Sequence, residues 1–136
     1  MAGYSGTALY KKLGIKPEFR VALHGLPSDV KAELKPALES CRIASDKRGA
    51  LDFAIMFVKS QVEMKKQFPG VARQLAPAGM LWVSWPKKSS GVTTDLVEDE
   101  VRRIGLEAGL VDVKVASFSP THTALKFVIP VSRRQK

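Results

Sequence analysis

The sequence predicts an α/β fold: a three-layer sandwich on a mostly parallel sheet of five or six strands, with an antiparallel hairpin at the C-terminus. Three observations support this prediction. Apolar runs alternate with amphipathic helical stretches along the chain. The run from Leu51 to Val58 is nearly continuous, which is typical of strands covered on both faces. The last two apolar runs are separated only by the turn-rich SPTHT, which favours an antiparallel pair.

The expected elements follow in the order strand, helix, strand, strand, helix, strand, helix, strand, strand. The strands are expected at residues 19–25, 41–45, 51–58, 80–85, 111–118 and 125–131. Such alternation favours parallel strands joined by right-handed crossovers. The 136 residues suit one α/β domain, residues 1–136, in which residues 1–18 form an N-terminal extension with a short helix.

Three longer helices are expected between the strands. The first begins at Ser28, a candidate N-cap, and should kink or split at Pro36. The second begins at the capping box Ser60–Glu63, and Pro69-Gly70 should divide it. The third begins at a similar box, Asp95–Glu98, with the aspartate as the cap.

Composition limits the class of protein. Apolar residues make up 45% and charged residues 26% of the chain, the ordinary balance of a soluble protein. No apolar run approaches the roughly 20 residues of a membrane span, and the N-terminus lacks a signal-peptide core, so a cytoplasmic location is expected. Cys41 is the only cysteine, which excludes an intramolecular disulfide and a multi-cysteine metal site. The two histidines have no metal-ligand spacing, so no metal is expected.

The formal net charge of +9 predicts salt-dependent attraction to polyanions. The basic residues are spread over both halves of the chain, and the densest group stands at the extreme C-terminus. A solvated basic surface is therefore the simpler interpretation, and nucleic-acid binding is the alternative. The residues that could contact an anion or a nucleic acid are Lys87, Lys88, Ser89, Ser90, Arg133 and Arg134.

The segment GMLWVSWPKKSSG, residues 79–91, ends a predicted central strand and leads towards the next helix. Trp82 and Trp85 should point to opposite faces, because their numbers differ by an odd count. Trp82 is expected in the core, and Trp85 is a candidate wall of a site. KKSSG lacks the Walker A glycine pattern. A plain connector is favoured, with a phosphate loop or a basic lip over a cleft as alternatives.

Residues 51–131 resemble the C-terminal half of a class I methyltransferase-like Rossmann domain. The resemblance rests on LDFAIMFV, QLAPAGMLWVSW, GLVDVKVASF and ALKFVIP. These give a strand that opens near Asp52, a leucine-x-proline-small-glycine turn at residues 75–79, and a terminal hairpin. The whole chain is also similar to a family of small bacterial proteins of unknown function, through YSGTALYKKLGIKPEFRVAL and GMLWVSWPKKSSGVTTDL. That second likeness implies no activity.

The resemblance implies a site beyond the carboxyl ends of the parallel strands, around the loop after the first strand. This loop, HGLPSD at residues 24–29, keeps one glycine where the pattern has two or three, and Leu26 and Pro27 add bulk. Asp46 stands 21 residues after Gly25, at the distance expected for a ribose contact. The candidate cofactor-binding residues are His24, Gly25, Ser28, Asp29, Asp46 and Trp85.

No catalytic residue is predicted, because the chain has neither a G-x-S-x-G elbow nor the proline-proline-aromatic motif of amino-methyltransferases. The loop is degenerate, and the first half is too short for the usual three strands. The sequence therefore favours a non-catalytic methyltransferase-like module, with a protein-binding or structural role and without a cofactor. Two alternatives stay open: a basic nucleic-acid-associated module, and a small S-adenosylmethionine-dependent transferase completed by dimerisation.

Overall fold

A computed structural model describes residues 8–44, 50–117 and 119–134 of the chain. In these residues six strands, four α-helices and two short 3-10 helices follow one another. They are α1 (Leu9–Leu13), β1 (Arg20–His24), α2 (Ser28–Leu38), β2 (Arg42–Ile43), β3 (Leu51–Phe57), α3 (Gln61–Ala72), β4 (Leu75–Pro86), η1 (Lys88–Ser90), α4 (Glu98–Glu107), β5 (Val111–Ser117), β6 (His122–Val128) and η2 (Val131–Arg133).

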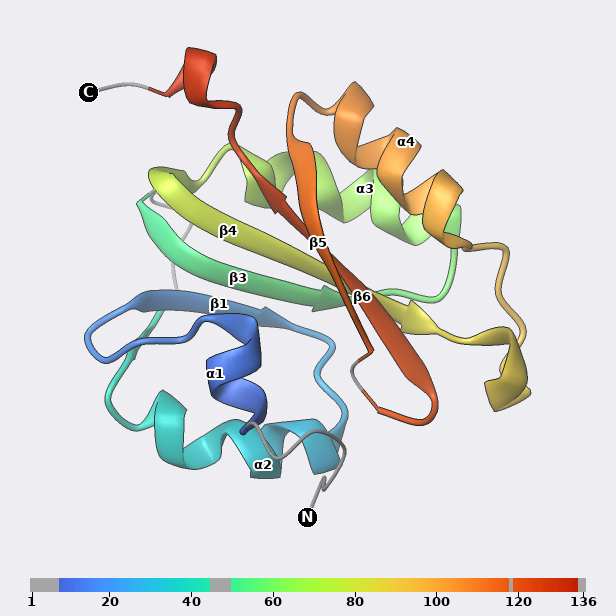
Figure 1. The fold of residues 1–136 in the computed structure, drawn as a ribbon, viewed down its shortest axis with the longest axis horizontal. Helices are drawn as coiled ribbons and strands as arrows, with labels where there is room; N and C mark the ends of the chain where they lie inside the picture. Colours follow the sequence, from blue (N-terminus) through green and yellow to red (C-terminus); the bar gives the residue numbers. More distant parts are fainter. Residues whose placement is uncertain (1–7, 45–49, 118, 135–136) are drawn as a thin grey trace.

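The strands form one sheet in the order β2-β1-β3-β4-β6-β5 (Figure 1). Strands β2, β1, β3 and β4 are parallel, whereas β6 runs antiparallel to both β4 and β5. The predicted mostly parallel α/β sheet with a C-terminal hairpin is confirmed. Because β6 inserts beside β4, the start of β6 lies next to the end of β4.

Helices cover both faces of this sheet: α1 and α2 lie on one face, and α3 and α4 on the other (Figure 1). Leu13 and Trp82 belong to the core under α1 and α2, and Phe68 and Phe127 to the core under α3 and α4. Most of β3 is buried, and its side chains enter both cores. This double burial explains why its sequence is apolar almost throughout.

Strand β4 is longer than predicted, because the turn at residues 75–79 belongs to it. Its pairing with β3 shifts register directly after Leu51, so the turn forms an irregularity inside the strand. A Cβ placed on Gly79 would collide with the carbonyl oxygen of Leu51. Glycine therefore allows the two strands to approach each other here.

The predicted division of the two helices at their prolines is wrong, whereas a kink at Pro36 stays a prediction. Helix α2 continues through Pro36, and α3 continues through Pro69 and Gly70. Both prolines lie within the last turn of their helix, where few backbone hydrogen bonds remain to be lost. A proline there removes one N–H donor without separating two long helical segments.

One of the predicted capping boxes forms in part and the other does not form. Ser60 Oγ accepts a hydrogen bond from the Glu63 amide at 3.1 Å, as predicted. The Glu63 carboxylate accepts from the Lys59 amide at 2.8 Å, one residue before the cap. Helix α4 instead begins at Glu98 after Val97, and Asp95 Oδ1 accepts a hydrogen bond from the Gln61 amide at 2.8 Å. The Asp95 carboxylate therefore satisfies the start of α3, an interaction that links two distant parts of the chain.

Among the described residues, no helix combines the length and the apolar character needed to cross a membrane.

Candidate functional site

Strands β1, β3 and β4 all end at one edge of the sheet, called here the carboxyl edge. In parallel α/β sheets, this is the edge where ligands bind. Four of the six predicted cofactor-binding residues, at positions 24, 25, 28 and 29, lie here between β1 and α2. Asp46 lies outside the described residues, so its predicted ribose contact stays a prediction.

The turn from β1 to α2 depends on Gly25. Its φ is +71°, a conformation that side chains disfavour, and a Cβ on it would lie 3.0 Å from the Phe57 carbonyl oxygen. The turn therefore packs closely against the end of β3. Pro27 occupies the N-cap position and makes no side-chain cap, so the prediction that Ser28 caps this helix is wrong. Ser28 and Asp29 form the exposed first turn of α2.

The first turn of α2 presents backbone N–H groups towards the carboxyl edge. The first backbone hydrogen bond of this helix runs from the Lys31 amide to the Pro27 carbonyl at 2.9 Å. The amides before Lys31 have no partner of this kind within the helix, as at every helix start. Together with the helix dipole they favour an anionic group.

His24 ends β1, beside Met56 of β3. Its side chain is half-buried, and burial lowers the pKa of His24 below 6.5, because a charged imidazolium loses hydration there. His24 is therefore mostly neutral at neutral pH.

His122, which the sequence analysis did not select, belongs to the same edge. It begins β6 and pairs with Pro86 at the end of β4. Its ring meets Phe57 edge-on, with centroids 5.6 Å apart, and its Nδ1 lies 3.0 Å from Thr121 Oγ1. No local signal in the sequence could have found it, because His122 reaches this edge only through the antiparallel pairing of β6 with the end of β4.

Burial, as the largest effect, lowers the pKa of His122. The nearby charge of Asp29 raises this pKa, and that of Lys59 lowers it. The two charged residues come from the start of α2 and from the segment after β3. His122 is therefore a mostly neutral imidazole at neutral pH, and the charges of Asp29 and Lys59 act on it in opposite directions.

The two tryptophans point to opposite faces, as predicted. Trp82 Nε1 donates a hydrogen bond to the Leu13 carbonyl at 2.9 Å, on the α1 side of the sheet. Trp85 belongs to the core under α3 and α4 and is only 3% exposed. The indole of Trp85 thus offers almost no surface to a ligand in this conformation.

The KKSSG segment is an ordered turn. Residues 88–90 form η1, and Gly91 has a φ of +80°. Ser90 Oγ donates to the Lys87 carbonyl at 2.6 Å and accepts from the Val92 amide at 3.2 Å. Lys87 Nζ lies 2.9 Å from Ser117 Oγ at the end of β5. Lys88 and Ser89 remain exposed.

Arg133 and Arg134 lie at the opposite edge of the sheet, because they follow the end of β6, which pairs with the first half of β4. Arg133 Nη1 donates to the Gly109 carbonyl at 3.0 Å, and Arg134 Nε donates to the Ile129 carbonyl at 2.9 Å. The basic residues of KKSSG and these two arginines therefore do not form one continuous surface.

The described ranges contain no group of three or more His, Cys, Asp or Glu side chains that could hold a metal ion. Cys41 stands apart from the carboxyl edge, with its Sγ 3.4 Å from the Lys16 carbonyl oxygen. Burial raises the pKa of this thiol, which disfavours the reactive thiolate.

The sequence matches no family model and no curated protein sequence, but solved structures share the fold. A putative type 11 methyltransferase from Sulfolobus solfataricus is 15% identical, with a TM-score of 0.64 over 94% of this chain and 93% of that chain. An S-adenosylmethionine-dependent methyltransferase from Clostridium acetobutylicum ATCC 824 is 9% identical, with a TM-score of 0.58 over 88% and 87%. Magnesium protoporphyrin IX methyltransferase from Synechocystis PCC 6803 with bound SAH is 14% identical, with a TM-score of 0.56 over 90% and 78%.

Two sequence predictions are wrong in the light of these neighbours. The sequence favours a non-catalytic module, whereas the structural likeness is to methyltransferases. It also favours the absence of a cofactor, whereas solved neighbours were determined with bound SAH or SAM. The predicted fold is confirmed: the chain has a reduced class I methyltransferase-like, Rossmann-like fold.

Proposed function

We propose that this protein binds S-adenosylmethionine at the carboxyl edge and acts as a small methyltransferase. The strand order, with β6 inserted antiparallel beside β4, and the methyltransferase neighbours support this proposal. It takes up the transferase hypothesis that the sequence left as an alternative.

The β1–α2 turn is the observation that carries the proposal. Gly25, at a φ of +71°, lets the backbone turn tightly against β3 and directs the start of α2 to the carboxyl edge. The N–H groups of that start suit the carboxylate of the methionine part of the cofactor. The exposed Asp29 carboxylate suits its ammonium group. These residues fit the amino-acid end of the cofactor, although Leu26 and Pro27 narrow the approach.

When bound, the cofactor would supply a methyl group on a sulfonium, and the acceptor would lose a proton. His122, which begins β6 at this edge, would take that proton. In the tautomer whose Nδ1–H donates to Thr121 Oγ1, Nε2 carries the free lone pair. Burial lowers the pKa of His122, so the imidazole is neutral and able to accept at neutral pH. Phe57 holds the ring edge-on.

Calorimetric titration with S-adenosylmethionine and SAH tests the proposal. Gly25→Ala should weaken binding about tenfold or more, because the new Cβ strains the turn and meets the Phe57 carbonyl. Gly91→Ala is the matched control: its φ is also positive, at +80°, but a Cβ there has open space around it. That variant should bind like the original chain.

Failure to bind either compound at millimolar concentration would overturn the proposal, and so would equal affinity in the Gly25→Ala and original proteins. Methyl transfer is then measured with radiolabelled S-adenosylmethionine and candidate acceptors. A cytoplasmic location, a protein partner or homodimer, and nucleic-acid contact through the basic side chains remain predictions from the sequence.

A further inference from the structure

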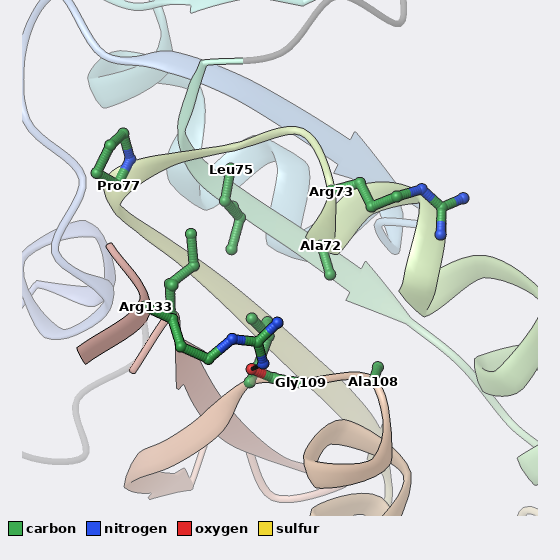
Figure 2. A pocket seen from close by; sticks show the side chains of 9 residues that line it. Ala72, Arg73, Leu75, Pro77, Ala108, Gly109 and Arg133 are labelled. Atoms are coloured by element: carbon green, nitrogen blue, oxygen red, sulfur yellow. Dashed lines mark hydrogen bonds between the residues drawn. The ribbon is translucent and has the colours of Figure 1, made fainter. Parts of the chain in front are cut away.

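A pocket of about 510 Å³ lies at the edge of the sheet opposite the β1–α2 turn. It is bordered by the C-terminal ends of α3 and α4, the start of β4 and the segment after β6 (Figure 2). Its volume falls within the range of small-molecule sites, roughly 300–1,000 Å³. Leu75, Leu110 and Ile129 contribute apolar side chains to its wall.

The charged residues that line this pocket are all basic. Arg73 and Arg133 are in its wall, and none of the acidic residues that the structure describes is. Glu107, at the end of α4, is not one of the residues that line the pocket. Its carboxylate forms an ion pair with Arg103 at 3.1 Å. In the described part of the chain, the pocket therefore combines apolar side chains with two positive charges that no acidic wall residue offsets.

Arg133 is held in place at this pocket. Its Nη1 donates to the Gly109 carbonyl at 3.0 Å, and Figure 2 shows the guanidinium lying over Gly109. Gly109 has a φ of +97°, and a Cβ on it would come within 2.7 Å of Arg133 Nη1. The missing side chain thus makes room for the guanidinium. One of its N–H donors is used in this way, and the others remain for a ligand.

Arg73 follows α3 at its C-cap. Its exposed side chain makes no hydrogen bond or ion pair within the described residues, and in Figure 2 it extends away from Arg133. No neighbouring group among the described residues therefore depends on Arg73 for a hydrogen bond or an ion pair. Its long side chain can turn towards the pocket by changing rotamer.

We propose that this pocket binds a small organic anion, with one carboxylate or phosphate group on an apolar body. The guanidinium groups would hold the acidic group through charge-assisted hydrogen bonds, and the apolar wall would cover the hydrocarbon part. The C-terminal ends of α3 and α4 carry partial negative charge, which opposes an anion. Binding should therefore depend strongly on both arginines.

Octanoate is the probe, and its binding is followed by amide chemical shifts and calorimetry. The amides of Ala108, Gly109 and Leu110 should shift in a saturable way. The neutral 1-octanol should bind much more weakly because it lacks the anionic group. Inorganic phosphate should also bind much more weakly because it lacks the apolar body. Arg133→Gln and Arg73→Gln should each weaken octanoate binding about three- to tenfold.

Lys65→Gln removes the same charge from an exposed position of α3 outside the pocket and should leave the affinity unchanged. The proposal is overturned if octanoate does not saturate these shifts at millimolar concentration, if octanol binds equally well, or if neither arginine variant loses affinity. Arg133 also holds Gly109, so the melting temperature of its variant is measured. If Arg133→Gln does not fold, the Arg73→Gln result decides.

Discussion

Gly105 of α4 lies so close to the ring of Phe127 in β6 that a Cβ on the glycine would overlap ring carbon atoms. The same fully buried ring meets Phe68 of α3 edge-to-face, with centroids 5.2 Å apart. Phe127 thus connects the sheet to both helices on this face. The distance of α4 from the sheet depends on the absence of a side chain at position 105.

Replacing Gly105 with alanine should destabilise the protein, against the usual order of helix propensity. Alanine is ordinarily better in a helix by about 1 kcal/mol. Here the added methyl group must displace the Phe127 ring, and overpacking of a core costs about 1–3 kcal/mol. Because the overlap with the ring carbons is severe, we take the upper part of that range, about 2–3 kcal/mol. After the gain in helix propensity, we expect a net loss of about 1–2 kcal/mol in the free energy of unfolding, measured by urea denaturation.

Gly70 in α3 provides the control for this prediction. A Cβ there has only the end of the Arg73 side chain near it, at 4.0 Å. Gly70→Ala should therefore stabilise the protein by about 0.5–1 kcal/mol. If the two alanine variants changed stability in the same direction, the close approach of α4 to Phe127 would be wrong.

Trp82→Phe should release α1 from the sheet. The substitution removes the indole N–H that donates to the Leu13 carbonyl at 2.9 Å and leaves a void in a fully buried position. The lost volume and the lost hydrogen bond together should lower the free energy of unfolding by about 2–4 kcal/mol. Hydrogen exchange of the α1 amides should increase in step with this loss.

Trp85→Phe removes the same atoms from the other face of the same strand. Trp85 is nearly as buried, but its indole makes no hydrogen bond with the described residues. The loss in the free energy of unfolding should be about 1 kcal/mol smaller for this variant than for Trp82→Phe. The hydrogen exchange of the α1 amides should stay unchanged. Faster exchange of α1 in both variants would contradict the assignment of α1 to the Trp82 face.

The order of strands and helices could be predicted because it depends on local patterns. The uninterrupted apolar run of residues 51–58 indicates burial on both faces, and the short SPTHT connector indicates a hairpin. The bounds of α4 and the length of β4 could not be predicted. Asp95 resembles a helix cap, but its carboxylate is bound by the Gln61 amide, which lies 34 residues earlier in the sequence.

The candidate site was predicted only in its contiguous part, residues 24–29. His122 joins that part because β6 inserts beside β4, and this placement depends on the pairing of distant strands. Trp85 was predicted to line the site because it stands at the end of a strand. Its exposure, however, depends on which face of the sheet its side chain occupies. The fold places it against the core under α3 and α4. Tertiary pairing, which no local pattern encodes, decides both outcomes.

Stability should fall as the pH drops below about 6.5, because burial lowers the pKa of both His24 and His122. The unfolded chain, whose histidines titrate near pH 6.5, then binds protons that the folded chain does not. The full stability is therefore present above that pH and is lost as the pH falls towards the folded-state pKa values of the two histidines.

Urea unfolding at about pH 7.5 and 5.5 measures this loss of stability, since ordinary carboxylates stay mostly ionised in this window. The double variant His24→Gln, His122→Gln should lose much less stability between the two pH values. A histidine that titrates above 6.5 in an NMR titration would contradict the buried, neutral state of that ring at the carboxyl edge.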